Sequence, residues 1–379
     1  YEIPKRDWSS DLCSSDLSIE IAYVSNGTSF TKKNIVQPKP KETSDVADVQ
    51  YDVVHCSLGT LRSIIHIPKN KSGKFPAIFY LQGYTCTSQE FPPNSKNALK
   101  MILDDWAKAG YVVYRVERPN VGDSRTTKDC RDIDYNEELE ENIAAYKKLL
   151  TYDFVDTSNI FLFGHSLGSV TAPLLAETYQ PKGIIVYGAV LRSWFEYFIN
   201  ISRIQSTYFG ASVVMAEAKA RTFLPLYYEW LENGKSIEEL KQNPKFKSIL
   251  ESTDNPLGIS GDYVFGRHYS FWQTMNLQHI AEAWSKVTGK VLAMYGEFDV
   301  QAIDATDAEN IAKIVNENYP GNGSFLLMPK TEHLFLKANS YKEAIDISSP
   351  EKIIQSMNEL YNTEVGIKTI KWLDKVRKN

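Results

Sequence analysis

The sequence predicts an α/β protein with a mostly parallel sheet, helices on both faces of the sheet and an inserted helical cap. Short, nearly continuous apolar runs recur along the chain, and such runs are typical of strands buried on both faces. Helical patterns alternate with these runs, an order that favours parallel strands joined by helices. The alternation stops once, over residues 191–285, where helical periodicity, glycine and proline breaks and many aromatic residues predict the cap.

The predicted core begins at Tyr51. Two strands joined by a turn that contains Gly59 come first, and six buried runs follow them. The predicted strands cover residues 51–56, 61–68, 75–81, 111–116, 160–163, 184–187, 291–295 and 325–328. Helices are predicted between them at 94–108 and 135–150, the second with acidic residues early and lysines late, as a helix dipole prefers. The core is therefore expected at 51–190 and 286–379, around the cap at 191–285.

The residues before the core carry weaker signals. Residues 8–17 read W-S-S-D-L-C-S-S-D-L, which as protein is a polar tail with two weak capping signals. The DNA string TCTTCCGATCT, a common sequencing-adapter end, also translates as Ser-Ser-Asp-Leu, so we interpret residues 1–17 as an adapter-derived tail. Such a tail could stand where a native signal peptide was lost. The absence of a signal peptide from this sequence is therefore no evidence for a cytoplasmic location. Residues 18–50 are expected to form an extension and linker with one short strand at 19–24.

Composition and charge exclude several functional classes. The formal charge of −5 and the pI of about 5.8 give no basic footprint for nucleic acid. No apolar run reaches the roughly 18 residues that a membrane span needs. We find no HExxH pattern, paired CxxC, acidic cluster or glycine-rich phosphate loop, so neither a metal nor a cofactor is expected. The predicted partner is a small-molecule substrate, and the oligomeric state stays open.

The stretch F-L-F-G-H-S-L-G-S-V contains a candidate nucleophile, Ser166. A buried run precedes this serine and a small-residue helix follows it. On a sharp strand-to-helix turn the neighbouring positions must be glycine or small, and Gly164 and Gly168 meet that need. The helix N-terminus favours a developing negative charge nearby. The alternative is a strand–turn–helix corner without catalytic function.

A serine nucleophile needs a base and a carboxylate that orients this base. Of the six histidines only His333 follows the last buried run, whereas the others lie in early strands, in the serine turn or in the cap. The run before it ends in M-Y-G-E-F-D-V, which places Asp299 just after a strand, with Glu297 as the nearest rival acid. Serine, aspartate and histidine thus occur in this order, each after a buried strand, and we expect them at one edge of the sheet.

With this triad, residues 51–378 resemble the serine esterase and peptidase branch of the α/β-hydrolase superfamily. The resemblance rests on G-H-S-L-G, Y-G-E-F-D, T-E-H and the loop E-R-P-N-V-G-D-S. It implies a mostly parallel, eight-stranded sheet and two backbone N–H groups that bind the oxyanion, those of Leu167 and Tyr84. Many relatives have His-Gly where this sequence has Gln82-Gly83, and this departure leaves Gly83 as the alternative to Tyr84.

The predicted function is hydrolysis of carboxylic esters through an acyl-enzyme. A peptidase or an acyltransferase could use the same triad, and an inactive binding module is a further alternative. A serine at the turn disfavours the dehalogenases and epoxide hydrolases that use an aspartate nucleophile. A cap inserted after the strand that follows this turn hangs over Ser166, so some of its aromatic residues should line the substrate cleft. We predict Trp194 and Phe195 as wall residues and a substrate with an apolar or aromatic group, and assign most other cap aromatics to its own core.

Cysteine positions add an expectation about redox state. Apart from Cys13 in the tail, the chain has Cys56, Cys86 and Cys130. The last two follow the third and fourth predicted strands, which should be neighbours in the sheet, so their loops leave the same edge. A Cys86–Cys130 disulfide would favour an extracytoplasmic location, whereas two reduced thiols are the alternative. Cys56 fits a small core residue, and the location is otherwise open.

Overall fold

The computed structural model of the protein describes residues 18–25, 28–35, 39–69, 72–252 and 257–378. The chain divides into two compact units, one that ends at Glu42 and one that begins at Thr43. The first unit contains an antiparallel hairpin of β1 (Ser18–Ser25) and β2 (Thr28–Ile35), of which the sequence predicted only the first strand. The interpretation of residues 1–17 as a tail, including Cys13, concerns a part outside the described residues.

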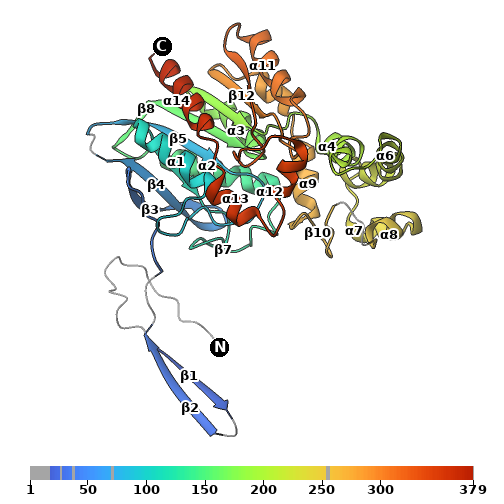
Figure 1. Cartoon of the computed structure of the whole chain (residues 1–379), viewed down its shortest axis with the longest axis horizontal. Helices are drawn as coiled ribbons and strands as arrows, with labels where there is room; N and C mark the ends of the chain where they lie inside the picture. The colour runs from blue at the N-terminus through green and yellow to red at the C-terminus, as the bar shows by residue number, and fades with distance from the viewer. Residues whose placement is uncertain (1–17, 26–27, 36–38, 70–71, 253–256, 379) are drawn as a thin grey trace. The chain divides into compact units, whose positions relative to one another are not determined.

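Nine strands form the sheet of the second unit within the described residues (Figure 1). They are β3 (Ala47–Cys56), β4 (Gly59–Pro68), β5 (Phe75–Leu81), β6 (Val112–Val116), β7 (Arg125–Thr126), β8 (Val155–His165), β9 (Gly183–Tyr187), β12 (Lys290–Gly296) and β13 (Gly323–Met328). Their order is β3-β4-β6-β5-β8-β9-β12-β13, and the short β7 pairs with β4. Strand β4 runs antiparallel to its neighbours, and β6, β5, β8, β9, β12 and β13 run parallel. The predicted mostly parallel sheet is confirmed, and β3 begins at Ala47 instead of Tyr51.

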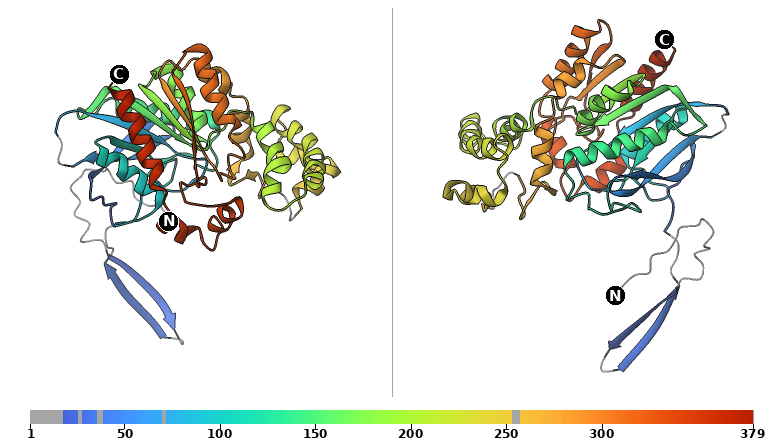
Figure 2. Two further views of the ribbon diagram at one scale, coloured as in Figure 1. Left: turned by 45° about the horizontal axis from the view of Figure 1, so that its top comes forward. Right: turned by 180° about the vertical axis from the view of Figure 1, so that it is seen from behind.

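Helices cover both faces of this sheet (Figure 2). On one face α1 (Ala98–Ala109) and α14 (Thr363–Arg377) form an apolar core with strand residues such as Ile78. On the other face α2 (Tyr135–Leu149), α3 (Gly168–Tyr179) and α11 (Thr306–Asn318) form a second core with residues such as Phe79. Successive side chains of a strand point to opposite faces, so a strand buried on both faces is apolar at every position. This explains the continuous runs that predicted the fold.

Residues 191–285, which we call the helical insertion, connect β9 to β12 and lie mostly to one side of the sheet (Figure 1). Its elements are α4 (Trp194–Asn200), η2 (Ile201–Gln205), α5 (Ser206–Tyr208), α6 (Val213–Tyr227), η3 (Tyr228–Glu232), α7 (Ile237–Lys241), α8 (Pro244–Leu250), β10 (Tyr263–Val264), β11 (Arg267–His268), α9 (Tyr269–Asn276) and α10 (Ile280–Ser285). Phe198 stacks on Trp230 and Phe265 with ring centroids 5.4 and 5.9 Å apart, so the insertion has an aromatic core of its own. Two further helices, α12 (Tyr341–Ile347) and α13 (Ile353–Glu359), lie between β13 and α14 and were not predicted.

Candidate active site

Ser166 lies in the turn between β8 and α3, where β8 ends. Its φ is 55°, in the left-handed region that residues other than glycine rarely adopt. Its N–H donates to the carbonyl of Tyr187 at 2.9 Å, and its carbonyl accepts from Ser169 N–H at 2.8 Å. The positive φ and the position between a strand and a helix agree with the sharp strand-to-helix turn that the sequence predicts.

The two glycines that flank this serine permit the turn to be this tight. A Cβ added to Gly164 would lie 2.5 Å from the carbonyl oxygen of Gly168, and one added to Gly168 would lie 2.1 Å from that of Leu81. No Cβ can approach a backbone atom so closely. Strands β5 and β8 and helix α3 therefore converge at a point that only glycine allows, as the sequence pattern requires.

Asp299 and His333 contact each other at the same edge of the sheet. Asp299 follows β12 and is fully buried. Both of its carboxylate oxygens lie 2.9 Å from His333 Nδ1. Its Oδ1 also accepts a hydrogen bond from the N–H of Ala302 at 2.9 Å. Burial alone would lower the pKa of His333, but the Asp299 charge and hydrogen bond, with a contribution from Glu332, raise it above its ordinary value. Because Nδ1–H donates to Asp299, Nε2 is the nitrogen available for proton transfer.

The end of β9 and the residue after it lie against the serine turn and the histidine. Ser166 binds the carbonyl of Tyr187, and a Cβ on the next residue, Gly188, would lie 2.7 Å from His333 Cε1 and 3.0 Å from Asp299 Oδ2. The three predicted residues therefore lie around the same short loop. The described residues contain no hydrogen bond between the Ser166 and His333 side chains.

Glu297, the rival acid, makes different contacts. It is half-buried, and its Oε2 accepts from the backbone N–H of Lys330 at 2.8 Å. No hydrogen bond joins it to His333 in the described part of the chain. The carboxylate at the histidine is that of Asp299.

His165, next to the serine, has a role that the sequence did not predict. Its Nε2 lies 2.9 Å from the carbonyl oxygen of His333, and its Nδ1 lies 3.2 Å from Tyr80 Oη. Burial, with the nearby His333 charge, lowers the pKa of His165 to about 3, so the ring is neutral at neutral pH. Nε2–H then donates to His333 and Nδ1 accepts from Tyr80, which links the serine turn to the histidine loop. The G-H-S pattern was the available signal, but it does not show where the ring points.

Backbone N–H groups from two segments lie near the serine. A Cβ on Gly83 would lie 3.4 Å from Ser166 Cβ and 3.7 Å from its Oγ, so the loop after β5 passes directly beside the serine. The N–H groups of Tyr84 and of its alternative Gly83, both in this loop, and that of Leu167 after the serine donate no hydrogen bond within the described residues. They are therefore candidates for binding an oxyanion.

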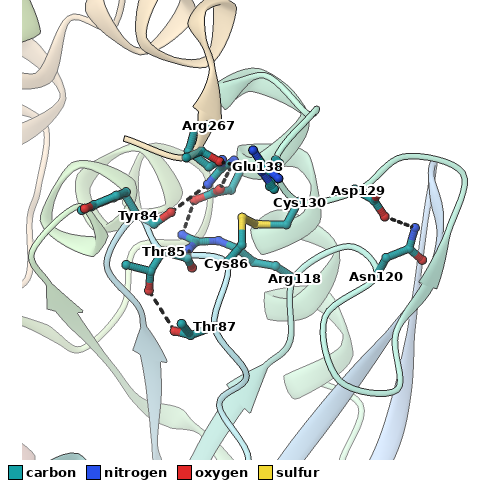
Figure 3. Close-up of a disulfide and its surroundings, with 12 residues drawn as sticks. Tyr84, Thr85, Cys86, Thr87, Arg118, Asn120, Asp129, Cys130, Glu138 and Arg267 are labelled. Atoms are coloured by element: carbon teal, nitrogen blue, oxygen red, sulfur yellow. Dashed lines mark hydrogen bonds and ion pairs between the residues drawn. A yellow bond between two sulfur atoms is a disulfide. The ribbon is translucent and has the colours of Figure 1, made fainter. Parts of the chain in front are cut away.

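The residues that follow Gly83 are anchored one after another (Figure 3). Arg267 donates to the carbonyl of Tyr84 at 3.0 Å, and Arg118 donates to that of Thr85. Cys86 forms a disulfide with Cys130, with the two Cα atoms 5.8 Å apart. The predicted pairing is therefore present in the structure, and Cys56 is a free, half-buried thiol.

We expect removal of this disulfide to lower the stability of the fold. The bond closes a loop with a sequence separation of 44. The variant with Cys86→Ser and Cys130→Ser should lose about 4 kcal/mol of unfolding free energy, since a loop of this length constrains the unfolded chain. Urea unfolding measures the loss, with Cys56→Ser as the control that leaves the bond in place. Two thiols titrating at Cys86 and Cys130 in unreduced protein would contradict the pairing.

A pocket of about 290 Å³ borders His333. Its walls come from the segment around Asp299, from α12 and from the loop after α12, and the helical insertion contributes Phe209. The other lining residues include Phe298, Val300, Gln301, Glu332, Ala344, Ile345 and Ser348. This pocket is mostly apolar and was not predicted, because its walls are distant in the sequence. Neither Trp194 nor Phe195 lines it.

The two predicted wall residues lie elsewhere in the helical insertion. Trp194 is buried against Trp272 at 5.0 Å between ring centroids, and Trp272 packs against Tyr84 at 5.7 Å. Phe195 is half-buried and packs edge-on against Tyr228 at 6.0 Å. Trp194 thus reaches Tyr84, in the loop beside the serine, through the ring of Trp272. Phe195 has its ring contact with Tyr228, within the insertion.

Comparison with known proteins supports the fold assignment. No family model matches the sequence, and no curated protein is significantly similar to it. A lipase in its open form matches with a TM-score of 0.51 and 12% identity, over 88% of this chain and 100% of the lipase chain. The acylaminoacyl peptidase of Pyrococcus horikoshii matches with a TM-score of 0.50 and 11% identity, over 87% of this chain and 42% of that chain. The protein therefore has the α/β-hydrolase fold.

Proposed function

We propose that this chain, with its α/β-hydrolase fold, is a serine hydrolase that cleaves carboxylic esters through an acyl-enzyme. One arrangement carries the proposal. A serine with φ of 55° follows a parallel strand, and its N–H donates to the last residue of β9. The next residue, Gly188, lies against a histidine paired with a buried aspartate. Strain at a serine and a buried carboxylate paired with a histidine are both costly, and such features gather at functional sites.

We infer the mechanism from the roles that these groups can have in acyl transfer. Ser166 Oγ attacks the ester carbonyl carbon while His333 Nε2 accepts its proton, and Asp299 fixes the tautomer and stabilises the imidazolium. The N–H groups of Leu167 and Tyr84 bind the oxyanion, each contributing about 2.7–4 kcal/mol. The C–O bond to the alcohol then breaks, and His333 returns the proton to the leaving oxygen. Water, deprotonated by the same nitrogen, hydrolyses the acyl-enzyme and restores the serine.

The pocket at His333 supports an apolar alcohol group in the substrate. The leaving oxygen must lie within hydrogen-bond reach of the histidine that protonates it. The pocket that borders this histidine is lined by Phe298, Val300 and Ile345 among others, so an apolar group attached to this oxygen fits it better than a charged one. The pocket therefore favours an apolar leaving group, and a peptidase or acyltransferase remains the alternative on the same triad.

Turnover of short-chain p-nitrophenyl esters tests the proposal. We expect hydrolysis of the acetate and butyrate esters, and much slower hydrolysis of matched peptide p-nitroanilides. Fast anilide cleavage without ester cleavage would identify a peptidase. Neither turnover nor labelling by a fluorophosphonate would identify a binding module.

Selectivity should depend on the two aromatic residues at the start of α4. Alanine at Trp194 or Phe195 should lower kcat/KM for bulky esters more than for acetate esters, because each lost apolar contact costs only about 1–3 kcal/mol. The larger effect is expected at Trp194, which reaches Tyr84 through Trp272. Val214→Ala, at a position 80% exposed in the same insertion, is the control. Equal losses on small and bulky esters would contradict a role in substrate selection.

The location we propose is extracytoplasmic, since disulfides such as Cys86–Cys130 persist in oxidising compartments. Among the described residues, no helix has both the length and the apolar character needed to cross a bilayer.

A further inference from the structure

Three charged side chains lie buried behind the loop that carries Tyr84. Arg118 belongs to the E-R-P-N-V-G-D-S loop after β6, Glu138 to the first turn of α2, and Arg267 to β11 of the helical insertion. Their side chains are 5%, 2% and 1% exposed. Arg118 binds Glu138 Oε1 at 2.6 Å and Arg267 binds Glu138 Oε2 at 2.9 Å, so one carboxylate joins two guanidinium groups from distant segments. We call these residues the Arg–Glu–Arg clamp.

Each arginine of the clamp also holds a backbone carbonyl of the oxyanion loop, which we define as residues 82–86 (Figure 3). Arg267 binds the carbonyl of Tyr84 and Arg118 binds that of Thr85. The disulfide of Cys86 fixes the next residue. Three consecutive residues are therefore anchored, and the residue before them, Gly83, lies beside the serine.

The clamp is not explained by stability alone. Removing three charged groups from water costs several kcal/mol for each ion. The attraction between these groups offsets this cost only when hydrogen bonds also satisfy their polar atoms. Burial alone would raise the pKa of Glu138, but the charges of Arg118 and Arg267 outweigh it and lower this pKa. Burial, followed by repulsion from Glu138, raises the pKa of the neighbouring Glu141 to about 9, so Glu141 is neutral at neutral pH. Within the clamp, one carboxylate thus faces two guanidinium groups.

We propose that Arg118, Glu138 and Arg267 are positioning residues that hold the N–H of Tyr84 where the oxyanion forms. The inference rests on the proposed function, because only a reaction with an oxyanion makes use of this donor. Oxyanion binding depends on donors that are fixed before the reaction. Since Arg267 belongs to the helical insertion, the clamp also couples the docking of this insertion to the geometry of the oxyanion site.

Two conservative variants and one matched control test the clamp. Glu138→Gln keeps the shape but removes the shared charge, and Arg267→Lys keeps the charge but cannot bind carboxylate and carbonyl in the same planar fork. We expect each to lower kcat for p-nitrophenyl acetate about 10- to 100-fold with little change in KM, as a displaced catalytic donor does. Binding of a trifluoromethyl ketone, which forms the tetrahedral adduct, should weaken in proportion. Arg192→Lys is the control, since Arg192 is a 15%-exposed arginine that pairs with Asp304 and Asp307 outside the oxyanion loop.

A second readout keeps the inference testable apart from catalysis. Amide hydrogen exchange in residues 82–91 should be faster in Glu138→Gln and Arg267→Lys than in the wild type and in Arg192→Lys. If the wild type cleaves no ester and is not labelled by a fluorophosphonate, the proposed function is wrong. Amide hydrogen exchange then still tests whether the clamp holds the oxyanion loop. Where Glu138→Gln does not fold, Arg267→Lys provides the same measurements. Unchanged kcat in these variants, an equal loss in Arg192→Lys, or unchanged exchange in residues 82–91 would overturn the proposal.

Discussion

Replacing Ser166 with alanine is expected to abolish labelling by a fluorophosphonate and to lower ester turnover by about 10⁶-fold, to the level of the oxyanion site alone. The hydroxyl is the atom that forms the covalent bond, so no other group in the turn can replace it. His333→Ala should have a similar effect, because without its base the serine is a weak nucleophile. Mass spectrometry of the labelled peptide identifies the modified residue.

The fold should survive both substitutions. Alanine at position 166 keeps the backbone hydrogen bonds to Tyr187 and Ser169, which use no side-chain atom. Thermal unfolding should therefore give Ser166→Ala a Tm close to that of the wild type. His333→Ala should unfold cooperatively at a lower Tm, because the buried Asp299 carboxylate loses its partner. Thr222→Ala, which removes an exposed hydroxyl from α6, is the control and should be labelled at the wild-type rate. A label that persists in Ser166→Ala would place the nucleophile elsewhere.

The sequence predicted the parts of the molecule that depend on local pattern. The strands were visible because a strand buried on both faces is apolar throughout, as Ile78 and Phe79 illustrate by entering opposite cores. The serine turn was visible because its tight backbone restricts Gly164 and Gly168. Asp299 and His333 were visible because each follows an apolar run, and parallel strands bring such positions to one edge. The prediction that the last run is buried was wrong, because β13 is an edge strand with Phe325 and Leu327 exposed.

The parts that were missed depend on contacts between distant segments. Nothing near Glu138 indicates that arginines from β11 and from the loop after β6 reach it, because local periodicity does not encode where a long polar side chain ends. The pocket at His333 also combines separate segments, one of them formed by the unpredicted helix α12. His165 was dismissed because it adjoins the serine, yet its ring crosses to the carbonyl of His333. Tertiary packing, and not sequence distance, decides these three features.

Replacing Asp299, the acid of the triad, is expected to cause the second large loss of activity. Asp299→Asn should lower kcat by about 10⁴-fold, because an amide cannot hold the required imidazole tautomer in place or stabilise the imidazolium. Glu297→Gln should cost less than about tenfold, since a glutamine oxygen still accepts from Lys330 N–H and no contact with His333 is lost within the described residues. Steady-state kinetics with one ester, on variants matched for Tm, compares the two. The opposite order of losses would make Glu297 the acid.

The pH dependence of kcat/KM separates these roles independently of the size of the loss. His333 must be neutral to accept a proton, so activity rises as the pH increases through its pKa. Asp299 raises this pKa by stabilising the charged ring, which places the rise above the ordinary histidine range. Removing the negative charge in Asp299→Asn lowers the pKa, and the rise should move to lower pH in the residual activity. Glu297→Gln should leave the pH of this rise unchanged. An equal shift in both variants would show that Asp299 is not the carboxylate that sets the pKa of His333.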